Sequence, residues 1–588
     1  MPQKRIAVID RELCNPKVAD YLCKRVCPVN RSGDECVVVS EEDGKPLINE
    51  GLCVTCGICV KKCPKQAIKV INLPARLDED PIHRYGPNLF SLYRLPVPKR
   101  RSVVGLIGPN GTGKSTVLSL LSGQSRPNCG LARAPPWGEI ISRFRGTELQ
   151  EYLGHLAGGS MTTAYKPQKV DAIPRMFKGK VSEFLEKTGP AGFGETVKRL
   201  GMENMVQRSL SDLSGGELQL VAVAATLLKD RDFYFFDEPS SYLDVFSRLV
   251  VANEIRRLAE RKVVMLVEHD LALLDYLTDY VHILYGEPGV FGIVSPPYGV
   301  RVGINNFLDG YIREDNVRFR KDGIVFSRSA RRPGRPSLFM QLPPFRKSFE
   351  SFRLETAAGN LCKGEVIGIL GPNAIGKSTF IRMLAGEIRP DSGKPETMEL
   401  SYKPQRVMLS EEEKGLSAQE LMAEKSGGSI SKFKGMVSFL GLDKLLEHGA
   451  GTLSGGELQS CFIAAALAKR SDLVLMDEPS AFLDVEQRLR VAKLIRQQAE
   501  EREKPFFVVD HDLLFIDAIS DRLMLFSGKP GVSGRAAAPV PMEQGMNSFL
   551  KALGITYRRD PQTGRPRINK PGSQKDREQK SKGRYYYA

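Results

Sequence analysis

The chain has 588 residues, of which 41% are hydrophobic and 26% are charged. This composition is ordinary for folded protein and excludes wholesale disorder, and the length allows three or four domains. No apolar run reaches the roughly 18–20 residues needed to cross a bilayer. The opening MPQKRIAVIDREL also lacks the apolar core of a signal peptide. We therefore expect a cytoplasmic protein with no membrane segment.

The chain is strongly basic. Lys and Arg outnumber Asp and Glu by 85 to 69, which gives a formal charge of +16. A solvated basic surface could account for this excess, but it also favours an anionic partner such as nucleic acid. The tail from Arg565 onward adds local support, with eight Lys or Arg against two acids.

Eight of the eleven cysteines fall within the first 63 residues: Cys14, Cys23, Cys27, Cys36, Cys53, Cys56, Cys59 and Cys63. Disulfides are not expected in a cytoplasmic chain, so this distribution favours metal ligation. The last four have the spacing C-x2-C-x2-C-x3-C-P, which is typical of bacterial ferredoxins. There, three thiolates bind one [4Fe–4S] cluster and the fourth binds a second cluster. A zinc site would more usually place its ligands in two pairs.

Cys27 is also followed by proline, so by the same logic it should complete the first cluster. The second cluster is then left with Cys14, Cys23, Cys36 and Cys63. We predict an α+β, ferredoxin-like domain with two [4Fe–4S] clusters over residues 1–72.

The remainder of the chain repeats itself. GPNGTGKST at Gly108 recurs as GPNAIGKST at Gly371, and YKPQ, LSGGELQ and DEPS each occur twice in the same order. Apolar β-rich runs alternate with helical stretches in both copies, which is typical of a parallel sheet in an α/β domain. We place these domains at residues 73–285 and 321–527. Segments 286–320 and 528–588 are rich in Gly, Pro or basic residues, and we predict a hinge and then a second hinge with a basic tail.

The first copy carries an insertion. Lys114 and Lys377 lie 263 residues apart, whereas Gln168 and Gln405 lie only 237 apart, so the first copy has 26 extra residues between these positions. The segment 137–159 has helical apolar spacing, and we predict a helix–loop–helix there.

Each copy has a G-x-x-x-x-G-K-[ST] loop after an apolar run, which is typical of a phosphate-binding loop. Backbone N–H groups meet the phosphates, the lysine reaches the β- and γ-phosphates, and the next Ser ligates Mg²⁺. A merely structural turn would not explain two copies with the same downstream motifs. The predicted ATP-binding residues are Asn110, Gly111, Gly113, Lys114, Ser115 and Thr116, and then Asn373, Gly376, Lys377, Ser378 and Thr379.

An Asp-Glu pair ends another apolar run in each copy. The Asp can hold the Mg²⁺ shell, and the Glu can act as the general base that polarises water. A His after the next run can contact the γ-phosphate, and an earlier Gln can lie near Mg²⁺ with the loop Ser. An isolated pair would more often be a solvated loop and an isolated His a core residue, but the repetition favours function. The residues are Gln168, Asp237, Glu238 and His269, and then Gln405, Asp477, Glu478 and His511.

LSGGE is the most specific motif. Its residues Ser214, Gly215 and Gly216, and then Ser454, Gly455 and Gly456, resemble the signature of ATP-binding-cassette ATPases. In that family the signature of one cassette covers the γ-phosphate held by the other. The resemblance implies a head-to-tail pair with two composite sites, which close on ATP and reopen after hydrolysis. Ala374 stands where the first loop has Gly111, and this difference favours unequal sites.

Ferredoxin cysteines followed by twin cassettes resemble the E-subfamily of ATP-binding-cassette proteins, the ribosome-recycling factor also called RNase L inhibitor. The likeness covers nearly the whole chain and includes CPVNRSG at Cys27, GLCVTCGICVKKCPKQAI at Gly51, HRYGPNLFSLYRLPVP at His83 and FRGTELQEY at Phe144. It implies a monomeric ATPase that splits the ribosome after termination with a release-factor-like protein and remains on the small subunit. Cassette closure would swing the iron–sulfur domain, which acts mechanically.

The same resemblance implies further residue roles. Tyr85 would stack on the adenine of the first site, and Phe345 is the candidate for the second. Ribosomal RNA would contact segment 137–159, segment 296–320 and the stretch near Tyr557, Arg558 and Arg559. Ala19 occupies a position that is often Cys in relatives, which indicates that a ligand at this position is not obligatory.

Two other functions remain open. In an electron-transfer ATPase, the clusters would deliver electrons, which requires a donor and an acceptor. In a cassette pair that energises a separate membrane transporter, the ferredoxin domain and the insertion would have no role.

Overall fold

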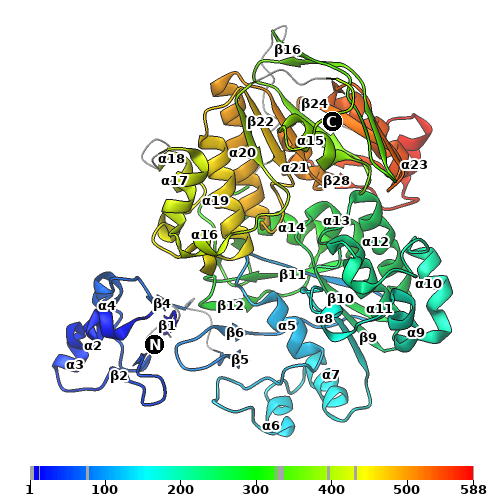
Figure 1. The fold of residues 1–588 in the computed structure, drawn as a ribbon. Helices are drawn as coiled ribbons and strands as arrows, with labels where there is room; N and C mark the ends of the chain where they lie inside the picture. Colours follow the sequence, from blue (N-terminus) through cyan, green and yellow to red (C-terminus); the bar gives the residue numbers. More distant parts are fainter. Residues whose placement is uncertain are drawn as a thin grey trace.

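The computed structural model describes residues 5–11, 13–73, 79–324, 326, 337–393, 398–428 and 434–586. Figure 1 shows the cysteine-rich domain in blue, beside β5 and β6 of the first cassette, and the second cassette above the first, in colours that run from light green to red. None of the helices in these ranges combines the length and apolarity that a bilayer crossing requires.

The cysteine-rich domain is built on two small antiparallel sheets and four short helices. Strand β1 (Arg5–Ile9) pairs with β4 (Ile68–Asn72), and β2 (Val37–Val39) pairs with β3 (Pro46–Ile48). The helices are α1 (Pro16–Ala19), α2 (Leu22–Val26), α3 (Pro28–Arg31) and α4 (Ile58–Lys62). The apolar residues Ala7, Ile9 and Ile68 pack against the cysteines, so the thiols form part of the core of this domain.

The first cassette is a nine-stranded mixed sheet with helices around it. The strand order is β5-β6-β12-β11-β7-β10-β9-β8, and β13 pairs with β11. The strands are β5 (His83–Arg84), β6 (Ser91–Tyr93), β7 (Val103–Ile107), β8 (Thr163–Lys166), β9 (Phe233–Asp237), β10 (Val263–Val267), β11 (Tyr280–Tyr285), β12 (Phe291–Val294) and β13 (Tyr298–Gly299). The main helices are α5 (Lys114–Leu121), α6 (Trp137–Ser142), α7 (Glu148–Ala157), α8 (Ile173–Met176), α9 (Val181–Thr188), α10 (Phe193–Arg199), α11 (Gly215–Leu227), α12 (Val245–Ala259) and α13 (Leu271–Leu277).

The second cassette repeats this topology. Its strand order is β17-β18-β25-β24-β20-β23-β22-β21, with β26 paired to β24. The strands are β17 (Arg346–Ser348), β18 (Arg353–Thr356), β20 (Val366–Leu370), β21 (Leu400–Lys403), β22 (Leu473–Asp477), β23 (Phe506–Val509), β24 (Arg522–Lys529), β25 (Ser533–Ala536) and β26 (Val540–Pro541); β16 (Leu338–Leu342) and β19 (Gly359–Cys362) form a separate pair. The main helices are α15 (Lys377–Leu384), α16 (Glu411–Gly415), α17 (Ala418–Ser426), α18 (Lys434–Phe439), α19 (Gly455–Ala468), α20 (Val485–Arg502) and α21 (Leu513–Ile519).

The predicted hinge boundaries are wrong at both places. Strand β12 lies inside the predicted hinge 286–320 but pairs with β6 and β11, and all four of its residues are buried. Strand β25 lies inside the predicted second hinge but pairs with β18 and β24. Both strands are only four residues long and stand between Gly and Pro residues, so their composition resembled that of a linker.

The remaining elements of these segments are further helices and short strands. They are α14 (Val300–Asp309), β14 (Tyr311–Ile312), β15 (Val317–Arg318), α22 (Met542–Leu553), β27 (Tyr557–Arg559), β28 (Pro566–Ile568) and α23 (Gln574–Ser581). The Arg301 Nε donates to Asp560 Oδ2 at 2.9 Å, and this joins α14 to the loop between β27 and β28. The two predicted hinges are therefore in direct contact.

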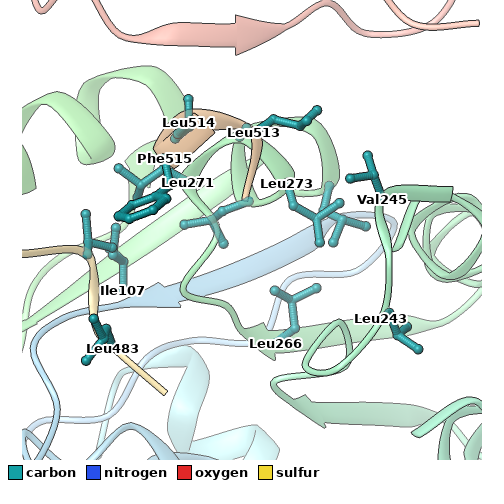
Figure 2. Packing of buried hydrophobic residues seen from close by; sticks show 14 of the residues in the cluster. Ile107, Leu243, Val245, Leu266, Leu271, Leu273, Leu483, Leu513, Leu514 and Phe515 are labelled. Carbon is teal, nitrogen blue, oxygen red and sulfur yellow. The ribbon is translucent and has the colours of Figure 1, made fainter. Parts of the chain in front are cut away.

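A shared apolar cluster fills the space between the cassettes. Figure 2 shows Leu513, Leu514 and Phe515 at the start of α21 close to Leu271 at the start of α13. Both helices follow the His of their cassette directly. Apolar packing therefore joins the two helices that follow the predicted catalytic histidines in one shared core.

Candidate ATP sites and cysteine cavities

Both phosphate-binding loops lie between a buried central strand and a helix that begins at the Lys. Gly113 and Gly376 occupy the left-handed region at φ 93° and 95°, which favours glycine. Lys114 Nζ donates to the carbonyls of Gly108 and Pro109, each at 2.8 Å. Lys377 makes the same bonds to its own loop. Burial lowers the pKa of both lysines to about 8, so phosphate oxygens would be favourable partners for either ammonium group.

The predicted catalytic residues converge in each cassette. Glu238 Oε1 accepts a hydrogen bond from Gln168 Nε2 at 2.6 Å and lies 3.3 Å from His269 Nε2. Burial alone would raise the pKa of Glu238, but His269, Ser241 and Lys114 hold it at about 2, so the carboxylate is ionised at neutral pH. An ionised carboxylate next to a phosphate-binding loop can serve as a general base.

The second cassette has the same arrangement. Gln405 Nε2 donates to Glu478 Oε1 at 2.7 Å, and His511 Nε2 lies 3.4 Å from that oxygen. His511, together with Lys377 and Gln405, holds the pKa of Glu478 at about 2 against the effect of burial. In this structure the two glutamines predicted to lie near Mg²⁺ thus bind the glutamates through their amide nitrogens.

Two buried lysines of the YKPQ motifs fix the catalytic loops, and the sequence reasoning assigned them no role. Lys166 Nζ donates to the carbonyls of Asp237 and Glu238 at 2.9 and 3.1 Å. Gln219, on the signature helix α11, donates to the same Glu238 carbonyl at 2.7 Å. Glu238 has a left-handed φ of 47°, and a non-glycine residue keeps such a conformation only when its surroundings hold it. The repetition of YKPQ was the available signal for Lys166.

The same contacts recur at Glu478, which has a φ of 48°. Lys403 Nζ donates to the carbonyls of Asp477 and Glu478 at 2.9 and 3.2 Å. Gln459, on α19, donates to the Glu478 carbonyl at 2.8 Å. Each signature helix is therefore attached to the catalytic loop of its own cassette.

The aspartates suit a Mg²⁺ ion. Asp237 Oδ1 and both carboxylate oxygens of Asp477 are buried with no hydrogen-bond partner among the described residues. Burial and the neighbouring Glu478 raise the pKa of Asp477 to about 6. Burial also raises the pKa of Asp237, and Ser115 and Ser378, which lie beside the two aspartates, offset only part of the rise. A hard cation with oxygen ligands would satisfy the orphaned oxygens, so Ser115 with Asp237 and Ser378 with Asp477 could hold Mg²⁺.

The two cassettes exchange contacts at their phosphate-binding loops. The backbone N–H of Asn373 donates to Asp244 Oδ2 at 2.5 Å, whereas the backbone N of the equivalent Asn110 lies 3.5 Å from Asp484 Oδ2. The Cβ of a residue at the signature Gly216 would lie 3.7 Å from Asn373 Nδ2. The signature of the first cassette therefore lies beside the second phosphate-binding loop, as the head-to-tail prediction requires.

The prediction that Phe345 stacks on the second adenine is wrong. Phe345 is fully buried and packs against Phe380 in the core, so no base can reach its ring. In the first cassette, Tyr85 follows β5, is 59% exposed and contacts Phe90, whose ring abuts Gly113.

In the second cassette, Phe349 occupies the position that Tyr85 has in the first cassette. It follows β17, is 44% exposed and contacts Phe352, whose ring abuts Gly376. Spacing alone could have identified it. Tyr85 precedes Lys114 by 29 residues (85 to 114) and Phe349 precedes Lys377 by 28 (349 to 377), whereas Phe345 precedes it by 32 (345 to 377).

The loop that carries Tyr85 also supports the cysteine-rich domain. The buried Asn88 side chain donates to the carbonyls of Ala7 and Ile48 and accepts from the Ile48 amide at 2.7 Å. Arg84 forms two hydrogen bonds to the Glu50 carboxylate, at 2.6 and 3.1 Å. The first nucleotide site is therefore continuous with the anchor of the cysteine-rich domain.

The eight leading cysteines line two cavities. The first cavity is lined by Cys27, Cys36, Cys53, Cys56 and Cys59, and the second by Cys14, Cys23 and Cys63. No group of three or more His, Cys, Asp or Glu side chains in the described ranges converges on one point that could hold a single metal ion. The thiols instead surround a volume, which is how an iron–sulfur cluster is ligated.

The prediction for Cys36 is wrong. This residue was expected at the second cluster, but it lines the first cavity, where burial and the neighbouring Cys27 and Cys53 raise its pKa to about 12. Cys27 and the group Cys53, Cys56 and Cys59 share that cavity as expected. Cys36 reaches it because the pairing of β2 with β3 brings Val37 opposite Ile48, a long-range contact that cysteine spacing does not reveal.

Comparisons with known proteins agree with this arrangement. A family model described as "ABC transporter" matches residues 98–241 and 354–481. One described as "4Fe-4S binding domain" matches residues 46–69, and one described as "Possible Fer4-like domain in RNase L inhibitor, RLI" matches residues 5–35. A relative from Methanocaldococcus jannaschii, an uncharacterized ABC transporter ATP-binding protein, is 50% identical over 99% of this chain and 97% of its own length.

The translation initiation factor RLI1 of Saccharomyces cerevisiae is 42% identical over 99% of this chain and 98% of its own. The chain belongs to the ABCE1, or RNase L inhibitor, family. A model of ribosome-bound archaeal Pelota and ABCE1 is 51% identical, with a TM-score of 0.93 over the full length of both chains. The archaeal ABCE1 in a crystal structure with the ribosomal stalk protein aP1 is 51% identical, with a TM-score of 0.82 over 87% of this chain and all of the other.

In this ABCE1-family chain, the insertion consists of two helices, α6 and α7. Ile140, Leu149 and Leu153 are buried against the first cassette, while Arg143 and Arg145 are exposed. The stretch near Tyr557 differs from the prediction. Tyr557 is buried, and Arg559 pairs with Asp517 at 3.0 Å, so these two side chains serve the fold rather than an RNA surface.

Part of the basic tail also has an internal role. Arg565 is fully buried and Arg567 nearly so, and both guanidinium groups bind Asp275 on α13 of the first cassette. These arginines therefore attach the tail to the first cassette, and the basic surface of this family member is smaller than composition suggested. Lys575, Arg577 and Arg584 remain exposed.

Proposed function

We propose that this chain is an ATP-driven ribosome recycling factor that acts with a release-factor-like protein of the Pelota kind. It splits the ribosome after termination and remains on the small subunit, where it contacts ribosomal RNA. The observation that carries the proposal is the Asn88 loop, which supports the adenine-facing Tyr85 on one side and the cysteine-rich domain on the other. The structures of ribosome-bound archaeal Pelota and ABCE1 and of the aP1 complex add support from similarity.

The residues of each site have distinct tasks. Lys114 exchanges its loop carbonyls for the β- and γ-phosphates, and Ser454 of the other cassette covers the γ-phosphate. Glu238 accepts a proton from the attacking water, while Lys166 and Gln219 hold its backbone in place. Ser115 and Asp237 would hold a Mg²⁺ ion, which would supply charge stabilisation for the phosphates. Lys377, Glu478, Lys403 and Ser214 act likewise at the second site.

Closure of the cassettes would move the cysteine-rich domain. The signature of the second cassette approaches the first phosphate-binding loop when ATP is bound, and the adenine rests on Tyr85. Asn88 and Arg84 lie within four residues of Tyr85 and bind the cysteine-rich domain directly, so that domain follows any shift of the loop. The cysteines of the two cavities would hold iron–sulfur clusters, which would add rigid packing to the moving domain.

A co-sedimentation experiment tests the proposal. The double variant Glu238→Gln with Glu478→Gln keeps ATP bound because the general bases are lost. We expect it to sediment with small ribosomal subunits in ATP and to remain in the supernatant in ADP. The wild-type chain with ATP and a Pelota-type partner should convert whole ribosomes to subunits. Equal sedimentation in ATP and ADP, or splitting without ATP, would contradict the proposal.

A redox control separates this function from electron transfer. Splitting by the wild-type chain should proceed at the same rate with the clusters kept reduced by excess dithionite and with the clusters oxidised under argon. A requirement for one oxidation state would instead favour an electron-transfer ATPase.

A further inference from the structure

The two cysteine cavities are unequal. Five thiols line the first cavity, Cys27, Cys36, Cys53, Cys56 and Cys59, and three line the second, Cys14, Cys23 and Cys63. A [4Fe–4S] cluster binds four cysteine thiolates, one on each iron. The first cavity therefore has one thiol more than a cluster uses, and the second has one fewer.

The position of the missing thiol can be identified. Ala19 ends helix α1 and lines the second cavity together with Cys14 and Cys23. Its side chain is a methyl group, which cannot ligate iron. A cysteine at this position would present its thiol to the same cavity as the other three.

Cys36 does not supply the fourth thiol. It is 1% exposed, lies in the wall of the first cavity, and its Sγ lies 3.9 Å from the Asn49 carbonyl. The thiols that interact with it are those of Cys27 and Cys53, both of the first cavity. Cys36 also lies outside the two segments that match iron–sulfur family models, residues 5–35 and 46–69. It is thus an additional thiol of the first cavity.

Another side chain of the second cavity, Tyr21, is already engaged. Its hydroxyl donates to the Gly44 carbonyl at 3.1 Å. The phenol therefore stabilises the loop before β3, and an iron ligand at this place would have to break that bond.

We infer that the second cavity holds an iron–sulfur cluster on three cysteine thiolates only, with one iron that has no cysteine ligand and can be released. Without a thiolate, that iron is held by the cluster sulfides and by exchangeable water or hydroxide. A one-electron oxidant then removes it: [4Fe–4S]²⁺ gives [3Fe–4S]⁺, one Fe²⁺ and one electron, which the oxidant accepts. The first cluster, with at least four thiolates, keeps all its irons.

Iron content and electron paramagnetic resonance of the full chain test this inference. The chain is reconstituted anaerobically with iron and sulfide, treated with ferricyanide and desalted. We expect about eight irons per chain before oxidation and about seven after it, together with the resonance of a [3Fe–4S]⁺ cluster. Retention of all irons with no such resonance would overturn the inference, as would about four irons at the start, since the second cavity would then hold no cluster.

Three variants locate the effect. Ala19→Cys supplies a fourth thiol and should abolish both the iron loss and the resonance. Cys36→Ala and Tyr21→Phe, as matched controls, should leave both unchanged. If Ala19→Cys still loses one iron, or if either control changes the loss, the assignment of the open position is wrong. None of these readouts involves ribosomes, so failure of the proposed recycling function would leave the result unaffected.

Discussion

The backbone N–H of Asn373 donates to Asp244 Oδ2 at 2.5 Å, across the boundary between the two cassettes. The pseudo-equivalent pair, Asn110 and Asp484, is separated by 3.5 Å. Each aspartate also caps the helix that follows it, through Oδ1. The loop of one cassette thus holds the phosphate-binding loop of the other, more tightly at the second site than at the first.

This asymmetry predicts unequal effects of two matched substitutions. Asp244→Asn keeps the helix cap through Oδ1. It replaces the accepting Oδ2 by a side-chain NH₂ group, which cannot accept the hydrogen bond from the backbone N–H of Asn373. A hydrogen bond to a charged group contributes about 1.5–3 kcal/mol, so turnover at the second site should fall about tenfold or more. The measurement is ATPase activity in a Glu238→Gln background, in which only the second site hydrolyses ATP.

Asp484→Asn in a Glu478→Gln background is the matched control. Because the Asn110 contact is long, its effect on the first site should be smaller, within about threefold. Equal losses in the two backgrounds would show that the difference between 2.5 and 3.5 Å has no functional weight.

Lys166→Met should impair hydrolysis through the position of Glu238. The methionine has a similar length but no donor, so the carbonyls of Asp237 and Glu238 lose their ammonium partner. We expect the free energy of unfolding to fall by about 1–3 kcal/mol and kcat at the first site to fall about tenfold. The KM for ATP should change little, because the Lys166 ammonium binds these carbonyls and not the phosphate-binding loop.

A double-mutant cycle separates positioning from general loss of structure. If Lys166 acts through Glu238, then Lys166→Met should cause little further loss of first-site turnover when it is combined with Gln168→Ala, which removes another contact of Glu238, in a Glu478→Gln background where only the first site hydrolyses ATP. An additional tenfold loss there would assign Lys166 an independent role. Lys403→Met with Gln405→Ala in a Glu238→Gln background provides the same comparison at the second site.

The nucleotide motifs could be predicted because their chemistry depends on short contiguous segments. Lys114 and Ser115, or Asp237 and Glu238, are neighbours in the chain, and the strand-to-helix turn sets their geometry locally. Two copies of each motif in one order were also enough to indicate two α/β cassettes. In the structure, the members of each set lie together.

The errors concern contacts between distant segments. Cys36 joins the first cavity only because β2 pairs with β3. The tail residue Arg565 looked like a nucleic-acid ligand because its partner Asp275 is 290 residues away in the sequence (275 to 565). Strand β12 is four residues long, and its place in the sheet depends on β6 and β11. No local pattern of residue types contains this information.

Phe349 should be the adenine-facing aromatic of the second site. Removing its ring in Phe349→Ala should weaken ATP binding there about tenfold, because stacking on a base contributes about 1–3 kcal/mol. Stability should change little, since the ring is 44% exposed. The measurement is nucleotide affinity in a Lys114→Ala background, which leaves only the second site able to bind ATP.

Phe345→Ala is the contrasting variant. Its buried ring packs against Phe380, so the substitution should lower the free energy of unfolding by about 3–5 kcal/mol. The melting temperature should fall clearly, and whatever folded protein remains should bind ATP normally. Weak binding in Phe345→Ala, with normal binding in Phe349→Ala, would reverse the assignment.

Asn88 should transmit changes at the first nucleotide site to the cysteine-rich domain. Asn88→Ala removes the acceptor of the Ile48 amide and the donor to the Ala7 and Ile48 carbonyls. We expect hydrogen exchange at the Ile48 amide to increase at least tenfold, because a buried hydrogen bond contributes about 1 kcal/mol or more. The Ile9 amide, which donates to the Asn88 main-chain carbonyl, serves as the internal reference.

Because Asn88 has a left-handed φ of 55°, Asn88→Gly repeats the loss of the side chain without backbone strain. Both variants should hydrolyse ATP at near wild-type rates but split ribosomes more slowly. Normal splitting with rapid Ile48 exchange would show that the anchor of the cysteine-rich domain is not used to transmit cassette closure.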